Sequence, residues 1–150
     1  MFHNTIFFYR VDERFGAFSN FAPFPIEIEG VVWPTSEHYF QAQKFADPAL
    51  QRQIRKTPSP MEAAQMGRRL PGLREDWDLV RDEVMMDALW AKFTQHKGLK
   101  RLLLGTDGSR LVEHTANDSY WADGGDGTGA NRLGELLMEL RDELASREPC

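Results

Sequence analysis

The hydrophobic pattern of the chain changes at Pro34, and this change limits the fold more than any other feature. Before it, residues 5–9 and 26–33 are rich in β-branched and aromatic residues and predict strands, with Gly30 interrupting the second run as a turn would. After it, apolar residues recur at the three- and four-residue spacing of helices. We therefore predict an α+β fold, predominantly helical, with a small N-terminal sheet.

Capping signals divide the helical part into several helices. Asp47 and Pro48 form the cap and first residue of one helix, and Ser59 and Glu62 form a capping box at the start of the next. A long amphipathic helix then ends before Gly98, with its core-facing side predicted to carry Trp77, Val80, Val84, Ala88 and Phe93. Shorter helices over residues 99–104 and 133–144 and an extended piece over residues 111–114 complete the prediction.

Length and composition indicate one compact domain over residues 1–150, because 41% of the residues are hydrophobic and 27% are charged. No stretch has the length of a signal-peptide core or a membrane span, and the single cysteine is Cys150, so we expect a cytoplasmic protein without disulfides and without a membrane partner. The net charge of −5 gives no basic surface for gripping long nucleic acid.

The segment that follows Pro34 carries the strongest chemical signal. On a helix over residues 36–46, the polar residues Glu37, Gln41 and Lys44 fall at i, i+4 and i+7 and share one face. The aromatic residues Phe40 and Phe45 flank this stripe. Two interpretations stay open from the pattern alone: the stripe lines an apolar pocket, or it forms the exposed side of an amphipathic helix.

In a partly dry pocket, a lysine and a carboxylate can act together. Desolvation lowers the pKa of a lysine such as Lys44 and frees an amine that attacks carbonyl carbons, while Glu37 moves protons. Sugars joined to a base through an exocyclic amine suit this pair, because they open to an imine that a lysine can exchange for its own. Water then releases the sugar.

A loop over residues 15–25 places an aromatic side chain at every third position. Its ring-bearing residues, which can belong either to the core or to a ligand site, are Phe15, Phe18, Phe21 and Phe24. Ser19 and Asn20 are better candidates for holding a ligand, because polar loop residues orient small molecules.

A second loop, residues 118–131, contains four glycines just before a helix. Free backbone N–H groups in such a loop favour phosphate, whereas Asp118, Asp123 and Asp126 suit ribose hydroxyls. Their spacing differs from that of a calcium loop. Trp121 either stacks on a heterocyclic base or anchors the loop, and both interpretations stay open.

The histidines do not suggest a metal site. None of the four has a shared metal-binding spacing, so we expect structural or exposed roles for His3, His38, His96 and His114 and no bound metal.

Three segments together resemble the NADAR family. They are FSNF at residues 18–21, WPTSEHYFQAQKF at residues 33–45, and the glycine-rich loop with the start of the last helix at residues 118–141. The resemblance extends over nearly the whole chain. It is closest to the bacterial stand-alone enzymes that hydrolyse early intermediates of riboflavin biosynthesis; similar proteins remove ADP-ribose from guanine in nucleic acid.

This resemblance implies an N-glycosidase without a cofactor that acts on a bond between ribose and an exocyclic amine. Lys44 would form a Schiff base and Glu37 would move protons. The residues implied to line the substrate site are Ser19, Asn20, Phe21, Gln41, Trp121, Asp123 and Asn131, with Arg10 as a weaker candidate for a phosphate contact. Similar sequences usually have glycine where this chain has Ala122, which would strain the loop if the position needed a positive φ.

The expected substrate is a ribosylaminopyrimidine phosphate. The alternative is ADP-ribosylated guanine, and nucleic acid would be a partner only in that case. A non-catalytic ADP-ribose-binding module is a third interpretation, against which the reactive pair Glu37 and Lys44 argues.

Overall fold

The computed structural model describes Phe2 and residues 4–148, so His3 and Cys150 lie outside the described residues. The chain divides into two compact units: Met1–Ser19 with His96–Cys150, and Asn20–Gln95. The single domain expected over residues 1–150 stays a prediction. None of the helices in the described part of the chain has both the length and the apolar content needed to cross a membrane.

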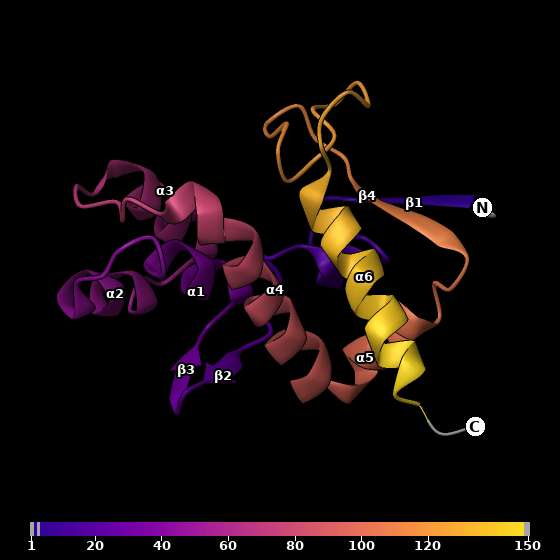
Figure 1. Ribbon diagram of the computed structural model, residues 1–150, viewed down its shortest axis with the longest axis horizontal. Helices are drawn as coiled ribbons and strands as arrows, with labels where there is room; N and C mark the ends of the chain where they lie inside the picture. The colour runs from indigo at the N-terminus through magenta and orange to yellow at the C-terminus, as the bar shows by residue number, and fades with distance from the viewer. Residues whose placement is uncertain (1, 3, 149–150) are drawn as a thin grey trace. The chain divides into compact units, whose positions relative to one another are not determined.

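The predicted α+β fold, predominantly helical, is confirmed (Figure 1). The expectation that the two N-terminal strand regions form one sheet is wrong. Strand β1 (Asn4–Phe8) pairs in parallel with β4 (Ser109–Glu113), whereas β2 (Ile26–Ile28) and β3 (Val31–Trp33) form a separate antiparallel hairpin. The partner of β1 lies about a hundred residues away along the chain, and local patterning does not reveal such pairings.

The first unit is built on the pair β1 and β4, which lie side by side in Figure 1. Helix α6 (Arg132–Ser146) packs against β4 and against α5 (Lys97–Leu104). Arg141 of α6 is buried, and its Nη1 donates hydrogen bonds to the carbonyl oxygens of Thr106 and Ser109 at 2.9 and 2.7 Å. These bonds fasten α6 to the start of β4.

The second unit is built around α1 (Ser36–Ala42), which packs against three other helices: α2 (Pro48–Arg55), α3 (Pro60–Arg69) and α4 (Trp77–Gln95). All seven residues of α1 are buried. Such a short helix gains little from its own hydrogen bonds, so its position is set by the helices around it.

The predicted helix starts in this unit are confirmed. Asp47 accepts a hydrogen bond from the N–H of Ala49, and Ser59 accepts one from the N–H of Glu62. The return bond of the expected capping box, from the Ser59 N–H to the Glu62 carboxylate, is absent from the described chain. The predicted apolar side of α4 is also confirmed, since Trp77, Val84, Ala88 and Phe93 are buried and only Val80 is partly exposed.

Candidate active site

Helix α1 ends at Ala42, so the predicted helix over residues 36–46 is too long and Lys44 lies in the turn that follows it. The Lys44 N–H donates to the carbonyl of Gln41 at 3.2 Å in a tighter turn. Next, the Lys44 carbonyl accepts from the N–H of Arg74 at 2.8 Å, and Phe45 forms an isolated bridge with Leu73. These bonds to the segment before α4 divert the backbone from the helical path.

Glu37 and Gln41 are directly connected within α1. The Gln41 Nε2 donates to the Glu37 Oε2 at 2.7 Å, and only 8% of Glu37 and 6% of Gln41 is exposed. The interpretation of this stripe as an exposed helix side is therefore wrong. Because both residues lie on one buried helix, this hydrogen bond fixes the orientation of the Glu37 carboxylate.

The carbonyl oxygen of the Gln41 side chain, Oε1, has an unusual environment. It is buried and has no hydrogen-bond partner among the described residues. It lies against Gly67 of α3, where an added Cβ would come within 1.8 Å of it. Glycine at this position allows α3 to approach α1 closely enough to enclose the side chain.

Asn20 belongs to the same cluster. Its Oδ1 accepts a hydrogen bond from the Ser36 Oγ at 2.8 Å, and its carbonyl accepts from the Glu37 N–H at 3.2 Å. The Asn20 Nδ2 donates to the Met85 Sδ at 3.3 Å. Asn20 therefore acts as a cap for the first turn of α1, next to the carboxylate of Glu37. Phe21 follows it and is partly exposed.

Lys44 is partly buried, and this environment favours its neutral amine. Burial lowers the pKa of Lys44, the charge of Glu37 raises it, and the charge of Arg68 lowers it. The resulting pKa lies below the ordinary value of a lysine. Lys44, Glu37 and Arg68 thus form one electrostatic group. The position of Arg68 on α3 gave no sequence signal, because it comes close to Lys44 only through the packing of α3.

His38 has the structural role that the sequence suggested. Its Nδ1 lies 2.8 Å from the Thr35 Oγ1 and its Nε2 lies 3.1 Å from the carbonyl oxygen of Thr57. Burial lowers the pKa of His38 and outweighs the hydrogen bond to Thr57. Across the described residues, no group of three or more His, Cys, Asp or Glu side chains is arranged to hold a metal ion.

In the first unit, the expectation of free N–H groups in the glycine-rich loop is wrong. The Gly124 N–H donates to the carbonyl of Asp118, and the N–H groups of Gly127 and Gly129 both donate to the carbonyl of Asp123. At the start of α6, the N–H groups of residues 131–133 donate to the carbonyls of residues 122, 120 and 121. The backbone N–H groups that could have donated to a phosphate therefore donate to carbonyl groups of the loop itself.

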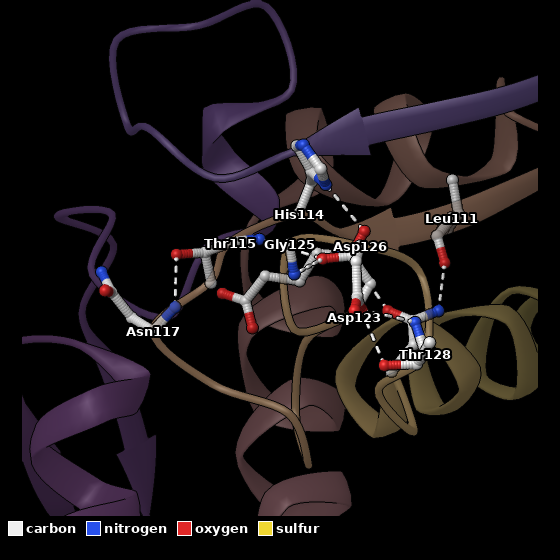
Figure 2. Close-up of polar contacts among 10 residues, drawn as sticks. Leu111, His114, Thr115, Asn117, Asp123, Gly125, Asp126 and Thr128 are labelled. Atoms are coloured by element: carbon white, nitrogen blue, oxygen red, sulfur yellow. Dashed lines mark hydrogen bonds and ion pairs between the residues drawn. The ribbon is translucent and has the colours of Figure 1, made fainter.

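Asp123 organises this loop. Its Oδ1 accepts hydrogen bonds from the N–H groups of Thr115 and Gly125 at 3.1 and 2.9 Å, and its Oδ2 lies 2.7 Å from the His114 Nδ1 (Figure 2). Burial alone would raise the pKa of Asp123, but these hydrogen bonds outweigh it and hold the pKa below its ordinary value. The His114 ring is about half exposed at the loop surface, with a side-chain exposure of 52%.

Asn131 joins the loop to the strand β4. Its Oδ1 accepts from the N–H of Glu113 at 3.0 Å, and its Nδ2 donates to the carbonyl of Leu111 at 2.9 Å. The residue is 1% exposed and has a left-handed backbone with φ of 51°. Ala122 is not among the described non-glycine residues with positive φ, so the strain considered for this position does not arise.

The remaining predicted residues differ in their surroundings. Trp121 is partly buried and meets Tyr120 edge to face at 4.8 Å between ring centroids. Ser19 is 5% exposed at the end of the single turn Gly16–Phe18. Arg10 is exposed and pairs with Asp12 at 3.3 Å, a contact weak enough for an anion to replace.

The structure thus brings together Asn20, Gln41, Glu37 and Lys44 in the second unit, and Trp121, Asp123 and Asn131 in one loop of the first. Sequence reasoning missed Ser36, Gly67 and Arg68. Ser36 could have been suspected, because it stands in the same motif as Glu37.

Known proteins resemble this chain over most of its length. The model of the NADAR domain matches residues 7–145. N-glycosidase YbiA of Escherichia coli (strain K12) is 58% identical over 139 residues, which cover 92% of this chain and 87% of that protein. Riboflavin biosynthesis protein VVA0006 of Vibrio vulnificus is 42% identical over 145 residues, covering 96% of this chain and 40% of that protein.

A solved structure gives the same result at the level of the backbone. The NMR structure of the E. coli protein YbiA superposes with a TM-score of 0.90 and 55% identity, covering 97% of this chain and 88% of that chain. Sequence and backbone agree from the first strand to the last helix, and the chain belongs to the NADAR family.

Proposed function

We propose that this N-glycosidase hydrolyses the bond between ribose and an exocyclic amine through an imine on Lys44. The observation that carries the proposal is the partly buried Lys44, whose pKa is lowered and whose amine is coupled to the buried carboxylate of Glu37. Relatives that cover most of the chain carry the name N-glycosidase, which supports the same reaction class.

The chemistry follows from these two side chains. The ribosylamine opens to an imine, and the neutral Lys44 Nζ adds to its anomeric carbon. This addition gives a geminal diamine, and Glu37 takes a proton from the Nζ and passes it to the exocyclic nitrogen. The bond between the anomeric carbon and the exocyclic nitrogen then breaks as the lysine imine forms, which releases the base as its amine. A water molecule then adds to the lysine imine with Glu37 as base, which releases the free sugar and restores the neutral amine.

A fixed carboxylate is needed for both proton transfers. The hydrogen bond from Gln41 holds the Oε2 of Glu37 and so keeps the carboxylate in one orientation. Asn20 contributes by holding the first turn of α1, on which Glu37 lies.

For the substrate, we propose a phosphorylated ribosylaminopyrimidine from the early steps of riboflavin biosynthesis. Two relatives that are more than 40% identical over nearly the whole chain are named riboflavin biosynthesis proteins. The net charge of −5 also favours a small substrate over a nucleic-acid strand. Within the second unit, Phe21 would provide a partly exposed ring for the base.

The proposal is tested by borohydride reduction in the presence of ribose 5-phosphate and, separately, ADP-ribose, followed by intact mass and peptide mapping. We expect one adduct, on Lys44. The Lys44→Ala variant should lose it, while a Lys56→Ala control at an exposed lysine should keep it. An adduct on another lysine, or normal turnover by folded Lys44→Ala, would contradict the imine mechanism.

The same experiment separates the substrates. Preferential trapping of ribose 5-phosphate supports the pyrimidine intermediate. Preferential trapping of ADP-ribose, with release of ADP-ribose from a modified guanine oligonucleotide, would replace it with the nucleic-acid substrate. Binding of ADP-ribose without turnover of either substrate would favour a non-catalytic module.

A further inference from the structure

A cavity of about 410 Å³ lies in the second unit, between the β2–β3 hairpin, the C-terminal half of α4 and Tyr39 of α1. It is lined by Glu27 and Glu29 from the hairpin and by Asp87 and Trp90 from α4. From this geometry we propose that the cavity binds a small organic cation, an alkyl ammonium or guanidinium group.

The carboxylates of this cavity lack a positive partner. Glu27, Glu29 and Asp87 form no side-chain hydrogen bond or ion pair with any other residue of the described chain. Burial raises the pKa of Asp87, and the neighbouring charges of Glu83 and Glu29 raise it further. Carboxylates that repel one another in this way gain most from a cation placed among them.

The environment of Tyr39 provides a second observation in favour of a ligand in this cavity. The residue is only 8% exposed, yet its hydroxyl forms no hydrogen bond with another described residue. It lines the cavity, and its pKa is raised to about 12 by burial, by Asp87 and by Glu29, so the hydroxyl lies within the field of these carboxylates. The hydroxyl is open to the cavity, and an N–H donor bound there would supply it with a hydrogen-bond partner.

The walls of the cavity favour an organic cation over a metal ion. The rings of Tyr39 and Trp90, the latter 37% exposed, can attract a cation through their faces. Among the described residues no cluster of His, Cys, Asp or Glu has metal-binding geometry. The C-terminal end of α4, with Thr94 and Gln95 in the wall, adds the negative end of the helix dipole.

The site is also held in shape. Gln95 joins the end of α4 to the hairpin, because its Oε1 accepts from the Glu27 N–H at 2.8 Å and its Nε2 donates to the Glu27 carbonyl at 2.7 Å. The volume lies within the range of small-molecule sites. A phosphorylated substrate would be repelled by these charges, so the ligand is distinct from that of the proposed reaction.

The test is a titration of the folded protein, followed by ¹H–¹⁵N NMR near neutral pH, with 1,4-diaminobutane as the probe and neutral 1,4-butanediol as its control. We expect saturable shifts at Glu29, Asp87 and Trp90 with the diamine only. Asp87→Asn and Glu29→Gln should each weaken binding about tenfold, and Tyr39→Phe about threefold. The exposed carboxylate variant Glu139→Gln should bind as the unchanged protein does.

Three outcomes would overturn the proposal. The first is absence of saturable shifts, or equal shifts with 1,4-butanediol. The second is displacement of the diamine by stoichiometric Mg²⁺, which would identify a metal site. The third is binding of a short arginine peptide without binding of the diamine, which would identify a protein side chain as the occupant. Folding of each variant is verified by its amide spectrum.

Discussion

At the scale of single residues, the amine of Lys44 is controlled by two opposite charges. Burial lowers its pKa, Glu37 raises it and Arg68 lowers it. Glu37→Gln removes the raising charge, so the pKa should fall further and imine trapping should reach half its maximum at a lower pH. Arg68→Gln should move this midpoint to a higher pH. Borohydride trapping with ribose 5-phosphate across a pH series measures both.

The control for this pair is Arg69→Gln, an exposed neighbour on α3 that does not contribute to the pKa of Lys44. Its midpoint should match that of the unchanged protein. If the midpoint pH moved in the same direction in Glu37→Gln and in Arg68→Gln, the titrating group would not be Lys44. The maximum amount of trapped imine is a separate measurement, which reports proton transfer by Glu37.

A second residue-scale prediction concerns Asn131. Asn131→Ala removes the partners of two backbone groups, the N–H of Glu113 and the carbonyl of Leu111, and leaves alanine with a φ of 51°. We expect the free energy of unfolding to fall by about 2–4 kcal/mol in urea denaturation. The exposed Asn117→Ala should change it by less than about 0.5 kcal/mol. Unchanged stability of Asn131→Ala with weaker substrate binding would instead assign Asn131 to the ligand alone.

At the scale of the helices, the contact of α1 with α3 depends on Gly67. In Gly67→Ala the new Cβ would meet the Gln41 Oε1 at 1.8 Å, so the Gln41 side chain must move away from Glu37. We expect a loss of about 1–3 kcal/mol in the free energy of unfolding, together with slower imine trapping. Urea denaturation and trapping kinetics measure the two effects.

The matched control is Gly98→Ala in α5, where an added Cβ meets nothing within 4 Å. Alanine is the better helix former, so this variant should be as stable as the unchanged protein or up to about 1 kcal/mol more stable. If Gly67→Ala behaved like Gly98→Ala, the close approach of α3 to Gln41 would not be needed for either stability or trapping.

The helices also show how far sequence could predict this fold. Local signals sufficed where the cause was local: Asp47 and Ser59 cap their helices, and the apolar spacing of α4 marks its buried side. They failed where the cause was distant. The parallel partner of β1 is β4, and helix α1 ends early because Lys44 bonds to the segment before α4.

In the candidate site, too, the features with a local cause could be predicted and those with a distant cause could not. The pairing of Glu37 with Gln41 came from helical spacing, because both residues lie on α1. The influence of Arg68 on Lys44 required the packing of α3, and the use of the loop N–H groups required the turns of residues 118–131. Spacing places residues on one element, whereas electrostatic neighbours on other elements appear only after packing.

At the scale of the whole molecule, the buried Lys92 should govern how stability depends on pH in the alkaline range. This residue of α4 is fully buried beside Phe24 and Phe93, and burial lowers its pKa to about 7. In the unfolded chain a lysine keeps its proton up to a pH of about 10.4. Between these values the unfolded state binds more protons than the folded state.

The sign follows from this difference. The free energy of unfolding should rise with pH between about 7 and 10, by at most about 1.4 kcal/mol per pH unit for one proton. In Lys92→Met, which keeps the side-chain length without the ionisable group, this rise should be absent. Urea denaturation of both proteins at a series of pH values measures it. Equal slopes for the two proteins would show that Lys92 keeps its proton in the folded state throughout this range, as a lysine does when its buried charge is fully compensated.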